Sequence, residues 1–270
     1  MQKKNIIVGL SGGVDSAVCA CLLKQQGHHV TGVFMQNWDD ETSKCTSTTD
    51  KHDVKTLCSQ LGIPFHSVNF SQDYMNKVFV KLLDGLKKGH TPNPDILCNQ
   101  EIKFKVLLDY ARQQNADYLA TGHYAKITQY HHQAALVRSI DDNKDQTYFL
   151  CRMPREALQH VLFPIGEFKK SEIRDLAQQF KLKVANKKDS TGICFIGERK
   201  FNDFISEYLL DRPGDIIDIN GNIIGRHKGL FYYTIGQRKG LNIGGNKNYK
   251  EQPWFVMQKN IKTNQIVVVQ

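Results

Sequence analysis

Short apolar runs alternate with amphipathic segments through most of this chain. Strand-like runs fall at residues 5–10, 29–34, 65–68 and 117–121, and helical periodicity falls near residues 14–26, 50–61, 73–88, 101–114, 171–180 and 200–209. Strands that alternate with helices favour a parallel sheet joined by right-handed crossovers. The pattern therefore predicts an α/β fold with a doubly wound parallel sheet for the first and larger part of the chain.

The pattern changes after residues 212–214, Arg-Pro-Gly. Residues 215–225 are apolar on both sides of Asn220-Gly221-Asn222, which is typical of a β-hairpin turn. Residues 254–258 and 265–269 are further strand candidates. This part of the chain is predicted to be a small, mostly β unit.

A Ser-Gly-Gly-Val-Asp-Ser loop, residues 11–16, joins the first predicted strand to the first predicted helix. We call this segment the phosphate loop. Gly12 and Gly13 allow close approach of an anion, Ser11 and Ser16 offer hydroxyl groups, and the helix directs free N–H groups at the same point. A Walker A loop would end in Gly-Lys-Ser/Thr, so the missing lysine argues against ordinary γ-phosphoryl transfer. A plain glycine-rich turn is the other interpretation, but such a turn does not require these polar residues.

Length and composition indicate a globular protein of two domains. The chain has 270 residues, which exceeds the usual size of one core, and we expect domains at 1–205 and 206–270. The apolar runs are too short to span a membrane, and residues 1–4 leave no room for a signal peptide, so a cytoplasmic location is expected. The 36 basic against 27 acidic residues give a net charge of +9, which suits a polyanionic partner or simply a basic surface.

Seven cysteines in a cytoplasmic chain do not form a disulfide framework. The spacing shows no C-x-x-C pair, which argues against a structural zinc site. Five of the cysteines are predicted to be packing or incidental residues: Cys19, Cys21, Cys45, Cys58 and Cys151. Cys98 and Cys194 remain as candidates for chemistry.

Both remaining cysteines have electropositive surroundings. The prolines before Cys98 are expected to prevent a helix there, and a helical pattern follows, so the thiol is placed near a helix N-terminus with Lys103 nearby. Such a position lowers the pKa of a thiol. Cys194 lies in a glycine-containing loop after two lysines. Each cysteine alone is equally consistent with packing, but together with the phosphate loop they indicate adenylation followed by sulfur chemistry.

The loop resembles the pyrophosphate loop of the ATP pyrophosphatase (adenine nucleotide alpha hydrolase-like) families, which cut ATP between its α- and β-phosphates. Six segments in order are similar to the tRNA-specific 2-thiouridylase (MnmA/TrmU) family: residues 9–16, 91–99, 120–124, 144–150, 189–197 and 233–241. The resemblance implies a sulfurtransferase that converts the wobble uridine of tRNA to 2-thiouridine. Its members usually continue into a further β-barrel. We expect this barrel to be absent from the chain, with ATP binding intact and tRNA affinity reduced.

The resemblance also implies ATP and Mg²⁺ as cofactors and assigns roles to individual residues. The ATP-binding positions are Gly9, Leu10, Ser11, Gly12, Gly13, Val14, Asp15, Ser16, Met35 and Gly122, with Asp15 near the magnesium. The positions that meet the target base or the tRNA are Asn93, Pro94, Asp95, His123, Lys144, Asp145 and Gln146. For His123, the alternative stays open that it is a histidine at the end of a strand whose hydrogen bonds are satisfied within the protein.

The chemistry that the resemblance implies has two stages. The C2 oxygen of uracil is a poor leaving group, so it is first adenylated, with Asp95 as a candidate acid or base. A persulfide on Cys194 then delivers sulfur, and Cys98 releases it by forming a transient disulfide with Cys194 or by liberating sulfide. The target base must be unstacked from the anticodon loop to reach this site.

The implied partners are tRNAs of the lysine, glutamate and glutamine type, together with a persulfide carrier protein or a cysteine desulfurase. Basic residues at 237–240 and 247–250 suit tRNA phosphates or form solvated loops. Two other interpretations stay open. An adenylating enzyme for a small molecule would not need Cys98 and Cys194, and a non-catalytic tRNA-binding protein would release no AMP.

Overall fold

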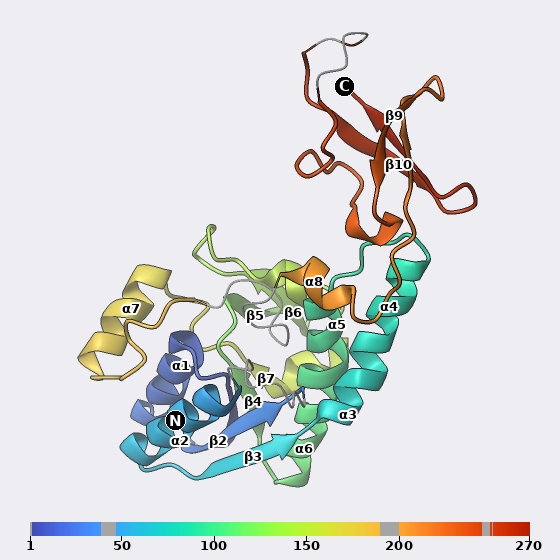
Figure 1. Cartoon of the computed structure of the whole chain (residues 1–270). Helices are drawn as coiled ribbons and strands as arrows, with labels where there is room; N and C mark the ends of the chain where they lie inside the picture. The colour runs from blue at the N-terminus through green and yellow to red at the C-terminus, as the bar shows by residue number, and fades with distance from the viewer. Residues whose placement is uncertain (1, 39–46, 190–199, 245–248, 250) are drawn as a thin grey trace. The chain divides into compact units, whose positions relative to one another are not determined.

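The computed structural model describes residues 2–38, 47–189, 200–244, 249 and 251–270 (Figure 1). These residues group into two compact units, the first formed by Met1–Val78 with Pro94–Glu198 and the second by Phe79–Asn93 with Arg199–Gln270. The second unit thus takes a segment from the middle of the chain. The sequence-based division at residues 205 and 206 stays a prediction.

Five parallel strands form the sheet of the first unit. Their order is β3 (Phe65–Asn69), β2 (His29–Gln36), β1 (Asn5–Leu10), β4 (Tyr118–Thr121) and β7 (Val161–Leu162). The chain moves from β1 toward β3 on one side and returns to β4 on the other side of β1. Ligands of open α/β sheets bind at such a reversal, outside the carboxyl ends of the strands.

Alternating apolar residues of β1 bury both faces of the sheet. Ile6 and Val8 join a core with helices α1 (Val14–Gln25), α2 (Ser47–Leu61) and α7 (Lys170–Gln179), which cover one face (Figure 1). Ile7 points to the opposite core. That core contains residues of the helical segment η2 (Asn99–Leu107) and helix α6 (Leu108–Gln113). The predicted doubly wound α/β sheet is confirmed.

The remaining elements of the first unit are short. They are α3 (Ser71–Tyr74), η1 (Met75–Phe79, which ends in the second unit), α5 (Pro94–Cys98), the antiparallel pair β5 (Ala125–Tyr130) and β6 (Gln133–Arg138), and the 3₁₀ turns η3 (Thr147–Leu150) and η4 (Arg155–His160). The sequence did not predict β5, β6 or β7. The expectation that prolines prevent a helix before Cys98 is wrong, because Pro94 opens α5 at the first helical position, where its missing N–H costs nothing.

The second unit is the small β structure that the sequence predicts. Its sheet has the order β10 (Phe255–Asn260), β11 (Gln265–Val269), β8 (Gly214–Ile217) and β9 (Ile223–His227), accompanied by α4 (Val80–Lys87), α8 (Phe201–Ile205) and the turn η5 (Leu230–Tyr232). Strands β8 and β9 form the predicted antiparallel hairpin. Asp218 fixes its turn by accepting the N–H groups of Asn220 and Asn222 at 2.9 and 2.8 Å. No helix among the described residues is long and apolar enough to cross a membrane.

Candidate active site

The phosphate loop lies between the end of β1 and the start of α1 and is braced from within. Gly12 has φ +77°, a conformation that favours glycine, and Gly13 is the N-cap residue of α1. The Ser16 hydroxyl donates to the Gly13 carbonyl at 3.2 Å and accepts the N–H of Ser11 at 3.2 Å. The backbone of the loop is therefore held in shape by its own residues, with the N-terminus of a twelve-residue helix behind it.

Gly122 follows β4 and packs directly against this loop. A Cβ atom at Gly122 would lie 2.7 Å from the Ser16 nitrogen and 2.8 Å from the Asp15 carbonyl carbon. Only a glycine thus allows the end of β4 to approach the first turn of α1. Met35, near the end of β2, packs against the core on the face of η2 and α6. Both lie in the part of the sheet where a nucleotide is expected, and their contacts with ATP stay predictions.

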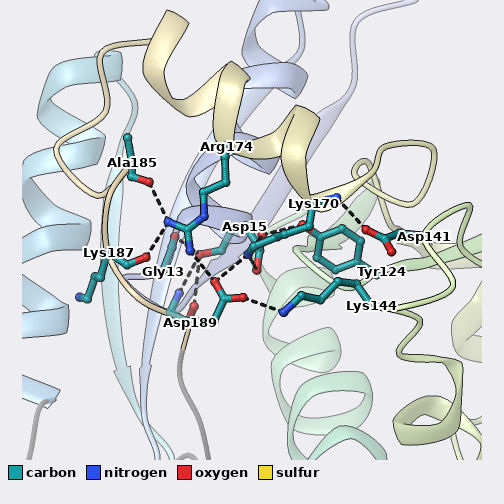
Figure 2. Close-up of polar contacts among 12 residues, drawn as sticks. Gly13, Asp15, Tyr124, Asp141, Lys144, Lys170, Arg174, Ala185, Lys187 and Asp189 are labelled. Atoms are coloured by element: carbon teal, nitrogen blue, oxygen red, sulfur yellow. Dashed lines mark hydrogen bonds and ion pairs between the residues drawn. The ribbon is translucent and has the colours of Figure 1, made fainter.

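An ion-pair network surrounds the acidic residue of the loop (Figure 2). The Lys170 ammonium lies 2.7 and 2.9 Å from the two carboxylate oxygens of Asp15 and 2.9 Å from Asp189. The Tyr124 hydroxyl donates to Asp15 at 2.8 Å. Burial, together with the charge of Asp15, raises the pKa of Tyr124, so this hydroxyl keeps its proton. Two donors therefore converge on the Asp15 carboxylate.

Asp189 is the second centre of the network. It accepts from Lys144 at 2.8 Å and from Arg174 at 2.7 Å, in addition to its ion pair with Lys170 (Figure 2). Burial opposes ionisation of Asp189, but hydrogen bonds from Lys144 and Lys170 outweigh it and lower its pKa to about 2. The carboxylate is therefore ionised at neutral pH and holds three cations around it.

The segment that leads to Asp189 is tied to the helices beside the loop. Arg174 of α7 donates to the carbonyl groups of Ala185 and Lys187 at 2.7 and 2.6 Å. The Lys187 ammonium bridges Asp50 and Asp53 of α2 at 2.8 and 2.7 Å. Asp50 in turn lies against the loop, because a Cβ atom at Gly12 would come within 3.0 Å of it. Residues from α2, α7 and the segment after α7 thus enclose the phosphate loop.

Cys98 is the last residue of α5 and is 1% exposed. The prediction of a thiol at a helix N-terminus is wrong, since α5 begins at Pro94 and the influence of the helix dipole falls off within the first turn. Asp95 does lie in that first turn. Burial raises the pKa of the Asp95 carboxyl, while Lys103 acts in the opposite direction. A carboxyl with a raised pKa suits the predicted role in proton transfer, which stays a prediction.

His123 lies in the interior of the first unit. Its side chain hydrogen-bonds to the Thr121 hydroxyl at 2.8 Å, packs against Phe104 and Phe163, and lies 3.4 Å from the Lys103 ammonium. Burial and the charge of Lys103 hold the pKa of His123 well below its usual value, so the ring is neutral. These contacts agree with a histidine at the end of a strand whose hydrogen bonds are satisfied within the protein. Its contact with tRNA stays a prediction.

The residues predicted to touch tRNA near 144–146 all make contacts inside the first unit. Lys144 pairs with Asp189, the Gln146 side chain accepts the Tyr124 N–H at 2.9 Å, and Asp145 accepts the Thr147 hydroxyl at 2.6 Å. The Lys144 side chain is nevertheless 42% exposed. Among the three, it is the cationic residue, and its side chain remains partly accessible to a nucleic acid.

Two predicted cysteines, Cys45 and Cys194, lie outside the described residues. The packing role predicted for Cys19, Cys21 and Cys58 agrees with their burial, which raises the pKa of Cys21 and Cys58 to about 11.

Sequence reasoning missed the cations that surround the loop, of which Lys170 lies nearest to Asp15. Lys170 is separated from the loop by 155 residues and stands beside Lys169 in an ordinary basic start of a helix. A pair of lysines before a helix gives no signal of a site. Arg174 and Lys187 are equally inconspicuous in the sequence.

The residues around Asp15 fit a magnesium ion that arrives with a nucleotide. No cluster of three or more histidine, cysteine or acidic side chains suited to a metal occurs among the described residues. Mg²⁺ is commonly held by one or two carboxylates, substrate phosphates and water, and Asp15 presents a carboxylate at the phosphate loop. One carboxylate beside a phosphate site is sufficient for this mode of binding.

A glycine-rich loop at the reversal of a parallel sheet defines this chain as a nucleotide-binding α/β protein. The family model described as the tRNA methyl transferase HUP domain matches residues 4–198, and the tRNA methyl transferase PRC-barrel domain matches residues 202–270. The chain is 56% identical to the tRNA-specific 2-thiouridylase MnmA 1 of Geobacillus kaustophilus and 53% identical to the tRNA-specific 2-thiouridylase MnmA of Staphylococcus aureus. Both alignments cover 100% of this chain and 73% of the relative. The chain belongs to the tRNA-specific 2-thiouridylase family, as the six motifs predict.

Solved structures that resemble this chain include a U34-tRNA thiolase and a 4-thiouridine synthetase. The U34-tRNA thiolase NcsA of Methanococcus maripaludis aligns with a TM-score of 0.45 and 22% identity over 68% of this chain and 59% of its own. A 4-thiouridine synthetase, in complex with RNA and ATP, aligns with a TM-score of 0.43 and 15% identity over 72% of this chain and 45% of its own.

Proposed function

We propose that this chain converts the wobble uridine of tRNA anticodons to 2-thiouridine in an ATP-dependent reaction. The observation that carries the proposal is an identity of 53–56% to named tRNA-specific 2-thiouridylases over the whole chain. The family models carry the name methyl transferase, but a loop built for phosphates has no obvious part in methyl transfer. ATP-dependent tRNA thiolation therefore accounts best for both the relatives and the site.

In the first proposed step, the C2 oxygen of uracil attacks the α-phosphorus of ATP and pyrophosphate leaves. The N–H groups of Gly12 and Gly13 and the hydroxyls of Ser11 and Ser16 would bind the departing pyrophosphate, with Asp15 holding Mg²⁺. Asp95 would move the proton of the uracil amide, for which its raised pKa is suitable. The product carries AMP on the former carbonyl oxygen.

In the second proposed step, sulfur replaces that oxygen and AMP leaves. The terminal sulfur of a persulfide on Cys194 attacks C2, which breaks the C2–O bond. Cys98 then attacks the Cys194 sulfur, releasing 2-thiouridine and leaving a disulfide between the two cysteines, or instead liberates sulfide from the persulfide to attack C2. Both routes leave a disulfide between Cys98 and Cys194, which a cellular thiol must reduce before the next turnover.

The tRNA contacts are proposed at Asn93, Pro94, Asp95, His123, Lys144, Asp145 and Gln146. Because the side chains of His123 and Gln146 are engaged in hydrogen bonds within the unit, they would shape the base site. The cationic side chain of Lys144 is 42% exposed and would meet a phosphate. The substrates would be tRNAs of the lysine, glutamate and glutamine type. We propose that the reaction occurs in the cytoplasm, where a persulfide carrier or cysteine desulfurase would load Cys194.

The test is to incubate unmodified tRNA with the chain, ATP, Mg²⁺ and a persulfide donor, and to analyse the nucleosides by mass spectrometry. We expect 2-thiouridine together with AMP and pyrophosphate, and no methylated nucleoside. The Cys194→Ser variant should form no 2-thiouridine. Cys151→Ser is the matched control, because Cys151 is exposed and has no proposed role. Formation of ADP in place of AMP, or thiolation that survives loss of Cys194, would contradict the proposal.

A further inference from the structure

We propose that Lys170 is a nucleotide-binding residue, whose ammonium binds the β- and γ-phosphates of ATP in place of the lysine that the phosphate loop lacks. The inference rests on the proposed ATP-dependent function and names a residue that the motifs do not contain.

Lys170 is the first residue of α7, and its side chain, which is 14% exposed, reaches across to the first turn of α1. The ammonium lies 2.7 and 2.9 Å from the oxygens of Asp15, so it stands directly at the phosphate loop (Figure 2). Its ammonium also lies 5.8 Å from the centre of the Tyr124 ring. The helix start that carries Lys170 is fixed, because Glu172 accepts the N–H of Lys169 at 2.7 Å and Asp141 accepts the N–H of Lys170 at 2.8 Å.

The charges around Lys170 show which of its contacts can be exchanged. Asp189 keeps Lys144 and Arg174 as partners if Lys170 moves away, so its carboxylate stays compensated. Among the ion pairs of the described residues, Lys170 is the one cation that reaches Asp15. A metal ion that binds Asp15 would neutralise the charge of this carboxylate in place of Lys170. The Lys170 ammonium could then turn toward the phosphates beside the same carboxylate at little electrostatic cost.

The chemistry at this loop requires such a cation. Pyrophosphate leaves with a large negative charge, and loops of the Walker A type place a lysine at the β- and γ-phosphates. In this chain Val14 and Asp15 stand where the loop lysine would be. A flexible lysine stem with a compact charge at its end is well suited to follow the phosphates from ATP to the departing product.

The test compares the wild type with Lys170→Met and Lys170→Arg by calorimetric titration with Mg-ATP, pyrophosphate and AMP. We expect Lys170→Met to weaken the binding of ATP and of pyrophosphate at least tenfold and to change AMP affinity less than twofold, because AMP lacks both phosphates. Lys170→Arg should restore part of the affinity, since the charge is retained. Lys169→Met is the matched control, as Lys169 is exposed and precedes the helix, and it should bind ATP like the wild type.

The outcomes separate this inference from the proposed function. Equal ATP affinity of the wild type and a folded Lys170→Met variant would overturn the inference alone. A parallel loss of ATP and AMP binding would also overturn it, because it would show that Lys170 only supports the shape of the site. Failure of the wild type itself to bind ATP would overturn both this inference and the ATP-dependent reaction. Thermal unfolding of each variant without ligand shows that the chain is folded in every comparison.

Discussion

The close contact of Gly122 with the phosphate loop yields a sharp test of how the site is built. In the Gly122→Ala variant, the new Cβ atom would meet the Ser16 nitrogen at 2.7 Å, the Asp15 carbonyl carbon at 2.8 Å and the Ser16 Cα at 2.9 Å, whereas ordinary van der Waals contacts begin at 3.4 Å. All three atoms belong to the backbone, so no side chain can turn away. The end of β4 and the first turn of α1 must therefore move apart by about 0.5 Å or more.

This separation has a cost in stability and a larger cost in binding. Overpacking of this kind destabilises a protein by about 1–3 kcal/mol, which for a unit of this size lowers the melting temperature by about 2–4 °C per kcal/mol. The displaced turn carries the N–H groups that are proposed to bind the phosphates, and a shift of this size would weaken several such hydrogen bonds at once. We expect ATP affinity to fall by about tenfold or more, which corresponds to at least ~1.4 kcal/mol.

Tryptophan fluorescence can report the unfolding of the first unit alone, because the chain has 2 tryptophans, Trp38 in the first unit and Trp254 in the second. In a Trp254→Phe background, unfolding reported by Trp38 measures the effect of Gly122→Ala on the first unit, and calorimetric titration measures ATP affinity. Gly244→Ala is the control, since a Cβ atom there meets nothing within 4 Å. If Gly122→Ala had the stability and the ATP affinity of the wild type, the close approach of β4 to the first turn of α1 would not be needed to shape the site.

Three further predictions concern other parts of the site. Gly13→Ala should fold normally, since Gly13 has φ −93° and its Cβ atom would meet only the Ser11 hydroxyl at 3.4 Å, yet titration should show at least tenfold weaker ATP binding because the methyl group obstructs the phosphates. Asp189→Asn should destabilise the first unit at pH 7 by about 1–2 kcal/mol, a value reduced for solvent screening of a side chain that is 32% exposed. Because the native pKa of Asp189 is lowered from 3.8 to about 2, the wild type holds this advantage above about pH 4 and loses it as the pH falls toward 2; urea unfolding across that range tests the sign, and a pH-independent difference would contradict it. Cys98→Ser should abolish 2-thiouridine formation while ATP affinity stays within twofold of the wild type, and unchanged thiolation in single-turnover assays would remove Cys98 from the mechanism.

Much of the fold could be predicted because hydrophobic periodicity reports burial directly. Strand β1 was predicted at residues 5–10, where it occurs, since a strand in the middle of a parallel sheet is apolar on both faces. The short strand β7 was missed, because two residues, Val161 and Leu162, give no periodic signal. The helix start at Pro94 was missed for a different reason. A proline excludes the residues before it from a helix but is itself favoured at the first helical position.

The candidate site also has parts that the sequence predicts and parts that it does not. The loop at residues 11–16 was recognisable, because its glycines, hydroxyls and following helix are contiguous in the sequence. The ion pair between Asp15 and Lys170 was not recognisable, because it joins residues 155 positions apart and depends on how α7 packs beside α1. The burial of His123 was also beyond the sequence, since Phe104 and Phe163 reach it from distant segments.

The family, the parallel sheet, the phosphate loop and the two cysteines that suggest sulfur chemistry could all be predicted from the amino-acid sequence. Each of these is encoded by local residue patterns or by motifs in a fixed order. The folded structure was needed to show that Gly122 must be a glycine, that Asp189 holds three cations, and that Lys170 supplies a positive charge to a loop without a lysine. Charge compensation and close packing depend on distances in space, and residue order does not contain those distances.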